Sequence, residues 1–194
     1  MRMCGPVLLL LAAIVAGCGK PPASVAPVIG RSWSTAEGGK VILKDLLGAR
    51  ATVFLTLDPE CPFCQLYAHD MQALSRSYAG QGVNFIGVYT GPYMESGKAA
   101  AFAVDAGFTF PQLMDNACLL ALALKARATP ECFVTDASGT VVYRGAFDDR
   151  AVRQGRKKIE AHEHYLDQAL AAFLHTGEAQ REMTAVGCIV ECGE

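Results

Sequence analysis

The feature that most constrains the fold is a pair of cysteines, Cys61 and Cys64, placed between an apolar run and an amphipathic segment. Residues 51–57 (Ala-Thr-Val-Phe-Leu-Thr-Leu) form a continuous apolar and β-branched run, which is typical of a strand buried on both faces. Pro59 ends that strand, and from Cys61 to Tyr78 the apolar residues recur with helical spacing. The sequence therefore predicts a strand, a short turn and a helix that begins at the Cys-Pro-Phe-Cys segment.

The position of these cysteines at a helix start predicts redox chemistry. The first N–H groups of a helix lack intrahelical partners and the macrodipole is positive there, so a thiolate on Cys61 is stabilised and its pKa falls below the free value of about 8.5. Pro62 suits the first turn, where its missing N–H costs no hydrogen bond. Cys64 lies on the same side of the helix. We expect Cys61 to be the nucleophile and Cys64 the resolving thiol, with a structural disulfide or half of a metal site as the alternatives.

The N-terminus has the pattern of an export signal. Arg2 is followed by an apolar run over 7–15, which is shorter than the roughly 20 residues that span a membrane, and small residues then precede Cys18. The segment Val15-Ala16-Gly17-Cys18 resembles the lipobox of bacterial lipoproteins, which implies that Cys18 is acylated and becomes the mature N-terminus. An ordinary signal peptide is the alternative. Acyl chains on Cys18 would anchor the protein to a membrane.

The chain divides by composition into four parts. We expect a signal peptide at 1–17, a proline-rich tether at 18–35, a folded domain at 36–176 and a cysteine-containing tail at 177–194. A content of 52% hydrophobic residues suits one sizeable core, and the net charge of -2 gives no indication of a nucleic-acid partner. The predicted location is the bacterial cell envelope, with the lipid-anchored protein facing the periplasm or the exterior.

Export matters for the cysteines, because disulfides form and persist outside the cytosol. Of the eight cysteines, Cys4 lies in the signal and Cys18 at the lipidation site, which leaves six in the mature domain and tail. The sequence allows many pairings among these six.

The remaining elements follow from periodicity and turn residues. Predicted strands cover 40–43, 83–89, 110–113, 132–135 and 141–144, and predicted helices cover 96–106, 116–125 and 157–174. Strand and helix alternate first, and a hairpin with a closing helix comes last. This order predicts an α/β fold with a central mixed β-sheet flanked by helices.

Three segments carry a resemblance to a known family. They are Leu-Asp-Pro-Glu-Cys-Pro-Phe-Cys at 57–64, Ala-Thr-Pro-Glu at 128–131 and Tyr-Arg-Gly-Ala-Phe-Asp-Asp at 143–149. From about Lys40 to the C-terminus, the chain resembles the redoxin branch of the thioredoxin superfamily, which includes the alkyl-hydroperoxide-reductase/thiol-specific-antioxidant (AhpC/TSA) proteins. The resemblance implies a thioredoxin-like fold, with Pro130 as a cis-proline beside the dithiol and the Thr129 backbone binding substrate.

The sequence also departs from this family at the dithiol. Peroxiredoxins place Thr or Ser three residues before the peroxidatic cysteine and a proline further upstream, where this chain has Asp58 and Phe54. A carboxylate at Asp58 is expected to repel a thiolate on Cys61 and to raise its pKa. Thioredoxin has Trp before its first cysteine, where this chain has Glu60. These differences argue against the usual peroxidase site.

The other four cysteines leave several interpretations open. Cys132 follows Pro130 by two residues and could add a third thiolate for copper(I) or zinc, although we expect a small buried side chain on a strand. Cys118 is expected in the core. For Cys188 and Cys192 we expect first a structural disulfide that pins the tail. A second dithiol that exchanges electrons with Cys61 and Cys64, or a metal clip, is the alternative.

These observations predict an envelope thiol-disulfide oxidoreductase with Cys61 as nucleophile and Cys64 as resolving thiol. The alternatives are a thiol peroxidase, with Cys61 as the peroxidatic thiol, and a thiolate copper-binding carrier. We expect a disulfide-containing protein or a thiol as substrate, contact with the membrane through the N-terminal lipid, no cofactor and no nucleic-acid partner.

Overall fold

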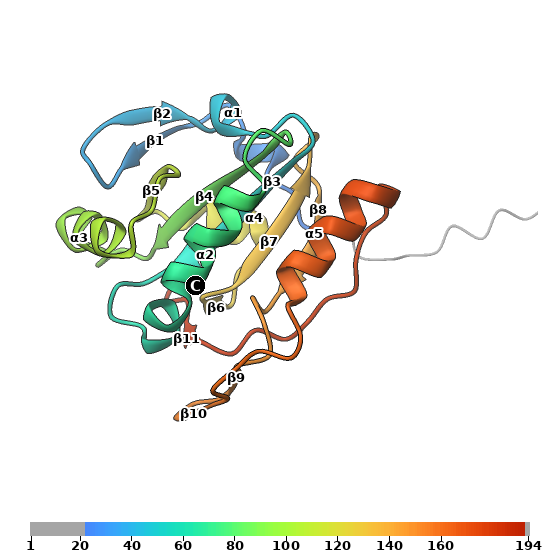
Figure 1. The fold of residues 1–194 in the computed structure, drawn as a ribbon. Helices are drawn as coiled ribbons and strands as arrows, with labels where there is room; N and C mark the ends of the chain where they lie inside the picture. The colour runs from blue at the N-terminus through green and yellow to red at the C-terminus, as the bar shows by residue number, and fades with distance from the viewer. Residues whose placement is uncertain (1–21, 193–194) are drawn as a thin grey trace, which may run out of the picture.

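The computed structural model describes residues 22–192 and is built on a seven-stranded mixed sheet with the order β2-β1-β5-β4-β3-β7-β8 (Figure 1). Strands β3, β4 and β5 are parallel to one another, and the flanking pairs are antiparallel. Their bounds are β1 Ser32–Thr35, β2 Lys40–Ile42, β3 Ala51–Leu57, β4 Val83–Thr90, β5 Gln112–Asp115, β7 Cys132–Asp136 and β8 Val141–Gly145. Strand β3 lies between β4 and β7, so the dithiol that follows its carboxyl end lies away from the two edge strands.

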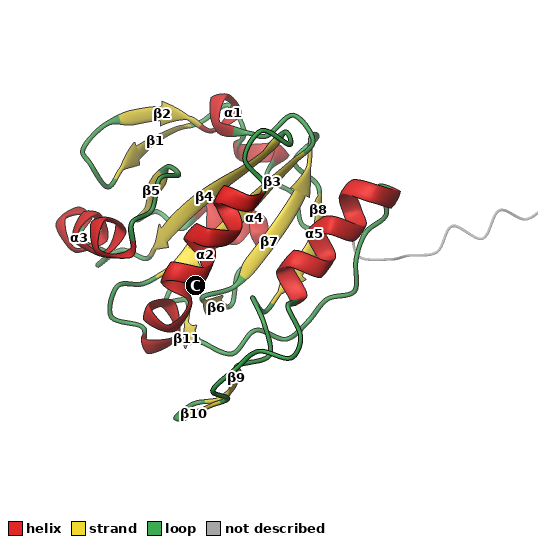
Figure 2. Ribbon diagram, in the orientation of Figure 1, coloured by secondary structure: helices red, strands yellow, loops and turns green. Residues whose placement is uncertain are grey.

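Helices cover both faces of the sheet, because alternate residues of the central strands point to opposite sides (Figure 2). Val53 and Leu55 of β3 pack in the core with α2 and α5, whereas Phe54 packs in the core with α4 and the N-terminal segment. The helices are α1 Leu43–Leu46, α2 Pro62–Ser77, α3 Ser96–Ala106, α4 Leu119–Leu124 and α5 Tyr165–Thr176, and a 3-10 turn, η1, spans Ala26–Val28. The predicted α/β fold with a central mixed sheet is confirmed.

Within residues 22–192, no helix has both the length and the apolar character needed to cross a membrane.

The predicted tether extends too far into the domain. From Ser24 onward the segment belongs to the fold: β1 lies within the sheet, and Val25, Val28 and Trp33 are buried. These side chains pack in the core cluster that contains α4 and Phe54, so the proline-rich stretch is held by burial despite its composition. The predicted signal peptide and the lipidation site Cys18, together with Cys4, lie outside the described residues.

The predicted closing helix over 157–174 starts eight residues too early. Residues 151–157 instead form a hairpin of β9 (Ala151–Arg153) and β10 (Arg156–Lys157), in which Gly155 has a φ of 72°. The connection to α5 is held by Asp149, whose carboxylate pairs with Lys158 and accepts the N–H of His162. The apolar Ile159 therefore lies in a loop and is exposed. The predicted strand at 110–113 lies at 112–115, and the predicted helix at 116–125 is confined to α4.

The C-terminal tail packs on the domain along an edge of the sheet. The N–H of Gln180 donates to the carbonyl of Val142, and the N–H of Met183 donates to the carbonyl of Arg144 on β8. The tail, red in Figure 1, then forms β11 (Cys188–Ile189), which pairs antiparallel with β6 (Ala128–Thr129). This path returns the tail to the start of α2.

Candidate active site

The dithiol lies where the sequence pattern predicted, at the junction of β3 and α2. Cys61 is the N-cap residue of α2 and Pro62 occupies the first turn. The turn is closed by the N–H of Cys61, which donates to the carbonyl of Asp58, and the N–H of Asp58 donates to Cys64 Sγ at 3.4 Å. Both cysteine side chains are buried.

A second loop brings a polar backbone group to the dithiol. The peptide bond between Thr129 and Pro130 is cis, and Cys61 Sγ lies 3.0 Å from the Thr129 carbonyl oxygen, to which it can donate as a thiol. The cis-proline that the family resemblance implied is therefore confirmed and lies beside the dithiol. Sequence reasoning missed the side chains that hold this loop. Thr56 Oγ1, at the end of β3, donates to the carbonyl of Ala128 and accepts the N–H of Glu131.

The buried Glu131 is the centre of this loop support. Its carboxylate accepts the backbone N–H of Arg127 and Ala128, and it forms a 2.8 Å ion pair with Arg144 Nε. Arg144 also donates to the carbonyl of Lys125. The cost of removing these two charges from water is offset by their ion pair and by the hydrogen bonds that both side chains make. Glu131 and Arg144 thus hold the Thr129–Pro130 loop against Cys61.

The tail adds a third cysteine to the site. In the pairing of β11 with β6, Cys188 lies opposite Thr129, and Cys188 Sγ is 2.8 Å from Cys61 Sγ. Gly187 makes this approach possible: a Cβ atom there would lie 2.2 Å from the carbonyl oxygen of Thr129, so a larger residue cannot occupy the same backbone position. The sequence pattern had left contact between the tail and the dithiol as one of several alternatives.

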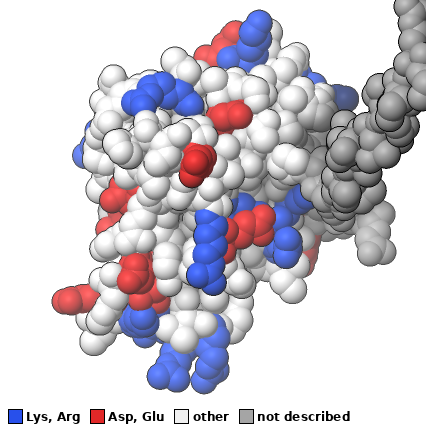
Figure 3. Space-filling view, turned by 90° about the vertical axis from the view of Figure 1, so that its right-hand side faces the viewer, with Lys and Arg blue, Asp and Glu red and all other residues white. Residues whose placement is uncertain are grey.

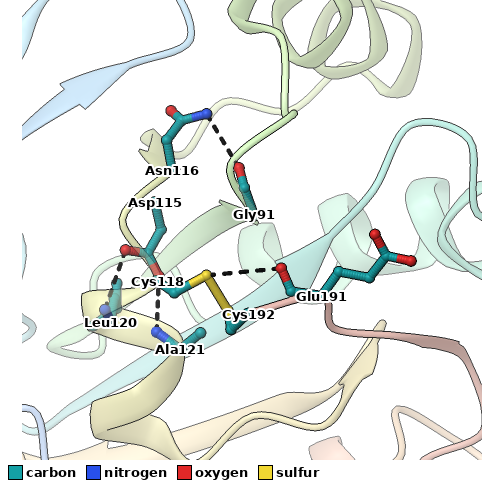
Figure 4. The surroundings of a disulfide bond; sticks show 8 residues. All are labelled: Gly91, Asp115, Asn116, Cys118, Leu120, Ala121, Glu191 and Cys192. Carbon is teal, nitrogen blue, oxygen red and sulfur yellow. Dashed lines mark hydrogen bonds between the residues drawn. A yellow bond between two sulfur atoms is a disulfide. The ribbon is translucent and has the colours of Figure 1, made fainter. Parts of the chain in front are cut away.

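A structural disulfide pins the tail as expected, but it uses only one of the two tail cysteines. Cys192 is bonded to Cys118, with a Cα–Cα distance of 5.7 Å, and Cys188 is a free thiol (Figure 4). Because β11 is extended, Cys188 faces Cys61 while the following residues carry Cys192 on to the loop between β5 and α4. Cys118 is buried as expected, but it is a disulfide partner and not a free core cysteine.

That loop is fixed by a buried acid. The carboxylate of Asp115 accepts the backbone N–H groups of Leu120 and Ala121 at the start of α4 (Figure 4). Burial raises the pKa of Asp115 to about 6, against the lowering effect of these hydrogen bonds. Asp115 thereby sets the position of Cys118, the anchor of the tail.

The three thiols at the site differ strongly in acidity. The hydrogen bond from the Cys64 thiol, followed by one from Cys188, lowers the pKa of Cys61 to about 5, although burial acts in the opposite direction. Burial and the neighbouring Cys61 raise the pKa of Cys64 well above its ordinary value, and the same causes raise the pKa of Cys188 to about 12. At neutral pH, Cys61 is therefore a thiolate and the other two thiols keep their protons.

The expectation that Asp58 raises the pKa of Cys61 is wrong, because the hydrogen bonds from Cys64 and Cys188 lower that pKa. The charge of Asp58 raises the pKa of Cys188, whereas at Cys64 this charge is opposed by the Asp58 backbone N–H, which donates to Cys64 Sγ and lowers its pKa. Glu60, the other acidic neighbour, is exposed and pairs with Lys98 at 2.8 Å. The charge of Asp58 thus adds to the difference in pKa between Cys188 and Cys61.

Cys132 lies apart from this chemistry, fully buried on β7, where burial raises the pKa of its thiol. The expectation of a small buried side chain is confirmed. Across residues 22–192, no group of three or more His, Cys, Asp or Glu side chains is placed to hold a metal ion.

The surroundings of the site combine an open cleft with a basic hairpin. The cleft has a volume of about 690 Å³ and is bordered by Glu60, Tyr93 and Cys188, among others. Gln154 of the β9–β10 hairpin donates to the carbonyl of Gly187 in the tail. The exposed cations of the hairpin are Arg153, Arg156 and Lys157. Figure 3 shows the face at the right-hand side of Figure 1, where Lys and Arg side chains gather at the lower end, at the height of the hairpin.

A family model for the AhpC/TSA family matches residues 23–144, from the N-terminal segment to β8. The chain belongs to the AhpC/TSA family. The matched region begins close to the first packed residues of the N-terminal segment, and it ends before α5 and the tail. A comparison with curated protein sequences gave no significant match.

Solved structures share the fold. A hypothetical protein of Sinorhizobium meliloti 1021 superposes with a TM-score of 0.76 at 23% identity, over 91% of this chain and 97% of that one. A secreted Mycobacterium tuberculosis disulfide oxidoreductase homologous to Escherichia coli DsbE gives a TM-score of 0.57 at 18% identity, over 75% and 98% of the two chains. A Xanthomonas campestris peroxiredoxin Q gives 0.57 at 18% identity, over 81% and 96%. The thioredoxin-like fold is thereby established.

Proposed function

We propose that the protein is an envelope thiol-disulfide oxidoreductase in which Cys61 is the nucleophile and Cys64 the resolving thiol. The observation that carries the proposal is the arrangement of Cys61 as a thiolate at the start of α2, with protonated thiols on Cys64 and Cys188 beside it. The thiolate is the reactive form of cysteine in exchange with a disulfide. The AhpC/TSA family and the disulfide oxidoreductase among the similar structures support this chemistry.

The reaction needs two exchange steps. In the first, Cys61 Sγ attacks one sulfur of a partner disulfide, forms a mixed disulfide with it and releases the other partner sulfur as a thiolate, which takes up a proton. In the second, Cys64 loses its proton and attacks Cys61 Sγ, so that the Cys61–Cys64 disulfide forms and the remaining partner thiol leaves with a proton. The partner gains two electrons and the dithiol loses two. The reverse sequence oxidises a partner dithiol.

The loop at β6 supports a role in partner binding. The Thr129 carbonyl lies 3.0 Å from Cys61 Sγ, and the buried Glu131–Arg144 pair holds this loop in place. A partner segment in extended conformation can add to β6 by backbone hydrogen bonds, with its sulfur facing Cys61. We infer that Thr129 and Pro130 form the contact with the reacting segment of the partner.

The envelope location rests on the N-terminal pattern and on a similar structure. The lipobox-like segment that ends at Cys18 predicts export and acylation. One of the similar solved structures is a secreted disulfide oxidoreductase. A lipid-anchored domain in the envelope would meet proteins that contain disulfides.

Insulin-disulfide reduction by the full chain tests the proposal, with hydrogen peroxide consumption followed in parallel. We expect the wild type to reduce insulin, Cys61→Ser to fall to the uncatalysed rate, and the Cys64→Ser/Cys188→Ala double variant, which has no thiol left beside Cys61, to stop at a mixed disulfide. Cys132→Ala is the matched control, since Cys132 is a free, fully buried cysteine on β7, and it should retain exchange. Insulin reduction that survives in Cys61→Ser contradicts the proposal, and so does a wild type that consumes peroxide but leaves insulin unchanged.

A further inference from the structure

The tail occupies the backbone edge at which a partner segment would bind. Strand β11 pairs with β6 in antiparallel register, with Cys188 opposite Thr129 and Ile189 opposite Ala128. The N–H of Val190 continues the pairing by donating to the carbonyl of Arg127 at 3.2 Å. The tail thus presents a cysteine sulfur to Cys61 from an extended segment, as a bound partner would.

Several independent contacts fix the tail in this position. Gly187 lets the backbone lie against the Thr129–Pro130 peptide, and its carbonyl accepts a hydrogen bond from Gln154 of the β9–β10 hairpin. Upstream, Met183 is bonded to the backbone of β8, and a Cβ at Gly145 would lie 1.9 Å from the Met183 carbonyl oxygen. Downstream, the Cys118–Cys192 disulfide holds the end of the tail. The close approach of the tail to the domain therefore depends on a glycine in each, Gly187 in the tail and Gly145 in β8.

We propose that Cys188 is a third redox residue of the site, which forms a disulfide with Cys61 while β11 fills the partner-binding edge. The inference rests on the proposed function, because it uses the same nucleophile. Cys188 Sγ already lies 2.8 Å from Cys61 Sγ, whereas a disulfide bond is about 2.05 Å long. A small movement of the half-buried Cys188 side chain therefore suffices to form the bond.

The step is an internal disulfide exchange. Starting from the Cys61–Cys64 disulfide, Cys188 loses its proton and attacks Cys61 Sγ. The Cys61–Cys64 bond breaks, the Cys61–Cys188 bond forms, and Cys64 takes up one proton as it leaves. The number of disulfides is unchanged, so the step needs no oxidant beyond the partner that oxidised the dithiol. The product is a closed form in which β11 is bonded to the site, and attack by Cys64 on Cys61 reopens it.

The Cys118–Cys192 disulfide makes this exchange effective. Cys192 is four residues beyond Cys188, so its bond to Cys118 keeps the Cys188 thiol close to Cys61 even when β11 leaves β6. A tethered reactant acts at a high effective concentration. An incoming partner must displace β11, and the tail competes with it for both β6 and Cys61.

Disulfide mapping of the oxidised Cys64→Ser full chain tests the inference. The protein is oxidised with diamide, its free thiols are alkylated, and the linked peptides are identified by mass spectrometry. We expect the Cys61–Cys188 disulfide in most molecules, next to an intact Cys118–Cys192 bond. If Cys61 instead stays free for alkylation or forms only intermolecular disulfides, the inference is wrong.

A second variant tests the contact between Gly187 and the Thr129 carbonyl and leaves all the sulfurs of the tail in place. In the Cys64→Ser background, Gly187→Ala should slow formation of the Cys61–Cys188 disulfide by about tenfold or more, because the added Cβ would collide with the Thr129 carbonyl. Gly97→Ala is the matched control, since a Cβ at Gly97 meets nothing within 4 Å, and it should leave the rate unchanged. Equal rates of Cys61–Cys188 disulfide formation in the two glycine variants would contradict the proposed position of the tail against Thr129.

Insulin reduction by the wild type separates this inference from the proposed function. If the wild type reduces insulin and Cys64→Ser gives no Cys61–Cys188 disulfide, the inference fails and the proposed function stands. If the Cys61–Cys188 disulfide forms and the wild type exchanges no disulfide with insulin, the proposed function fails and the redox pairing of Cys188 stands.

Discussion

The two closely spaced cysteine pairs of this chain behave differently because their backbones differ. Cys61 and Cys64 lie at the start of a helix, where residues three apart share a face, and their sulfurs interact directly. Cys188 and Cys192 lie on and after an extended strand, where residues four apart are separated by about 13 Å. The tail cysteines therefore have different partners, Cys61 and Cys118. Backbone conformation thus decides which cysteines meet.

The two regions also differ in how firmly they are held. The helical pair is buried beneath the sheet edge and sits in the core cluster with Tyr67 and Leu57. The tail has one disulfide and short backbone pairings, and Ile189 next to Cys188 is 82% exposed. Few buried apolar contacts mean a low free energy for local opening. This difference suits a fixed reactive pair that faces a displaceable third thiol.

The largest effect is expected on breaking the tail anchor. Cys192→Ser removes a disulfide between cysteines 74 residues apart, which should lower the free energy of unfolding by about 2–4 kcal/mol. Denaturant unfolding without reductant measures the difference from the wild type. The difference should vanish when both proteins are unfolded in excess reductant. Equal stability without reductant would show that the Cys118–Cys192 bond is absent.

A smaller effect is expected on the acidity of Cys61. Loss of a hydrogen bond to a charged group costs about 1.5–3 kcal/mol, which corresponds to roughly 1–2 pKa units, so Cys64→Ala should raise the pKa of Cys61 by about that amount. Cys188→Ala should raise the pKa less, since the Cys64 thiol is the stronger influence on Cys61. The thiolate absorbance as a function of pH measures both shifts. The reverse order would mean that the tail, and not the helical pair, controls the nucleophile.

The dithiol region was predictable because its determinants are local. The apolar run of β3, the proline in the first turn of α2 and the spacing of Cys61 and Cys64 all lie within about one strand and one helix. The helix α3 was predicted with its observed bounds, and the position of the cis-proline came from the family resemblance. These features can be predicted because residues close in the sequence determine them.

The tail contacts and the N-terminal packing depend on residues far apart in the sequence. Cys188 meets Cys61 across 127 residues, through a strand of only two residues that has no periodicity to detect. Trp33 and Val25 lie in a stretch rich in Pro, Gly and Ser, and only the assembled sheet shows that they are buried. The late start of α5 depends on Asp149, whose side chain holds the preceding loop. None of these contacts has a local signal.

The pH titration of the Cys61 thiolate tests the central claim most directly. The measurement is the difference in thiolate absorbance between the wild type and Cys61→Ser, with the dithiol reduced and the Cys118–Cys192 disulfide intact. Because the pKa of Cys61 is lowered to about 5, we predict that the thiolate forms as the pH rises through about 5 and is complete below neutral pH. A thiolate that forms only near the ordinary pKa of about 8.5 would contradict the assignment of Cys61 as the activated nucleophile.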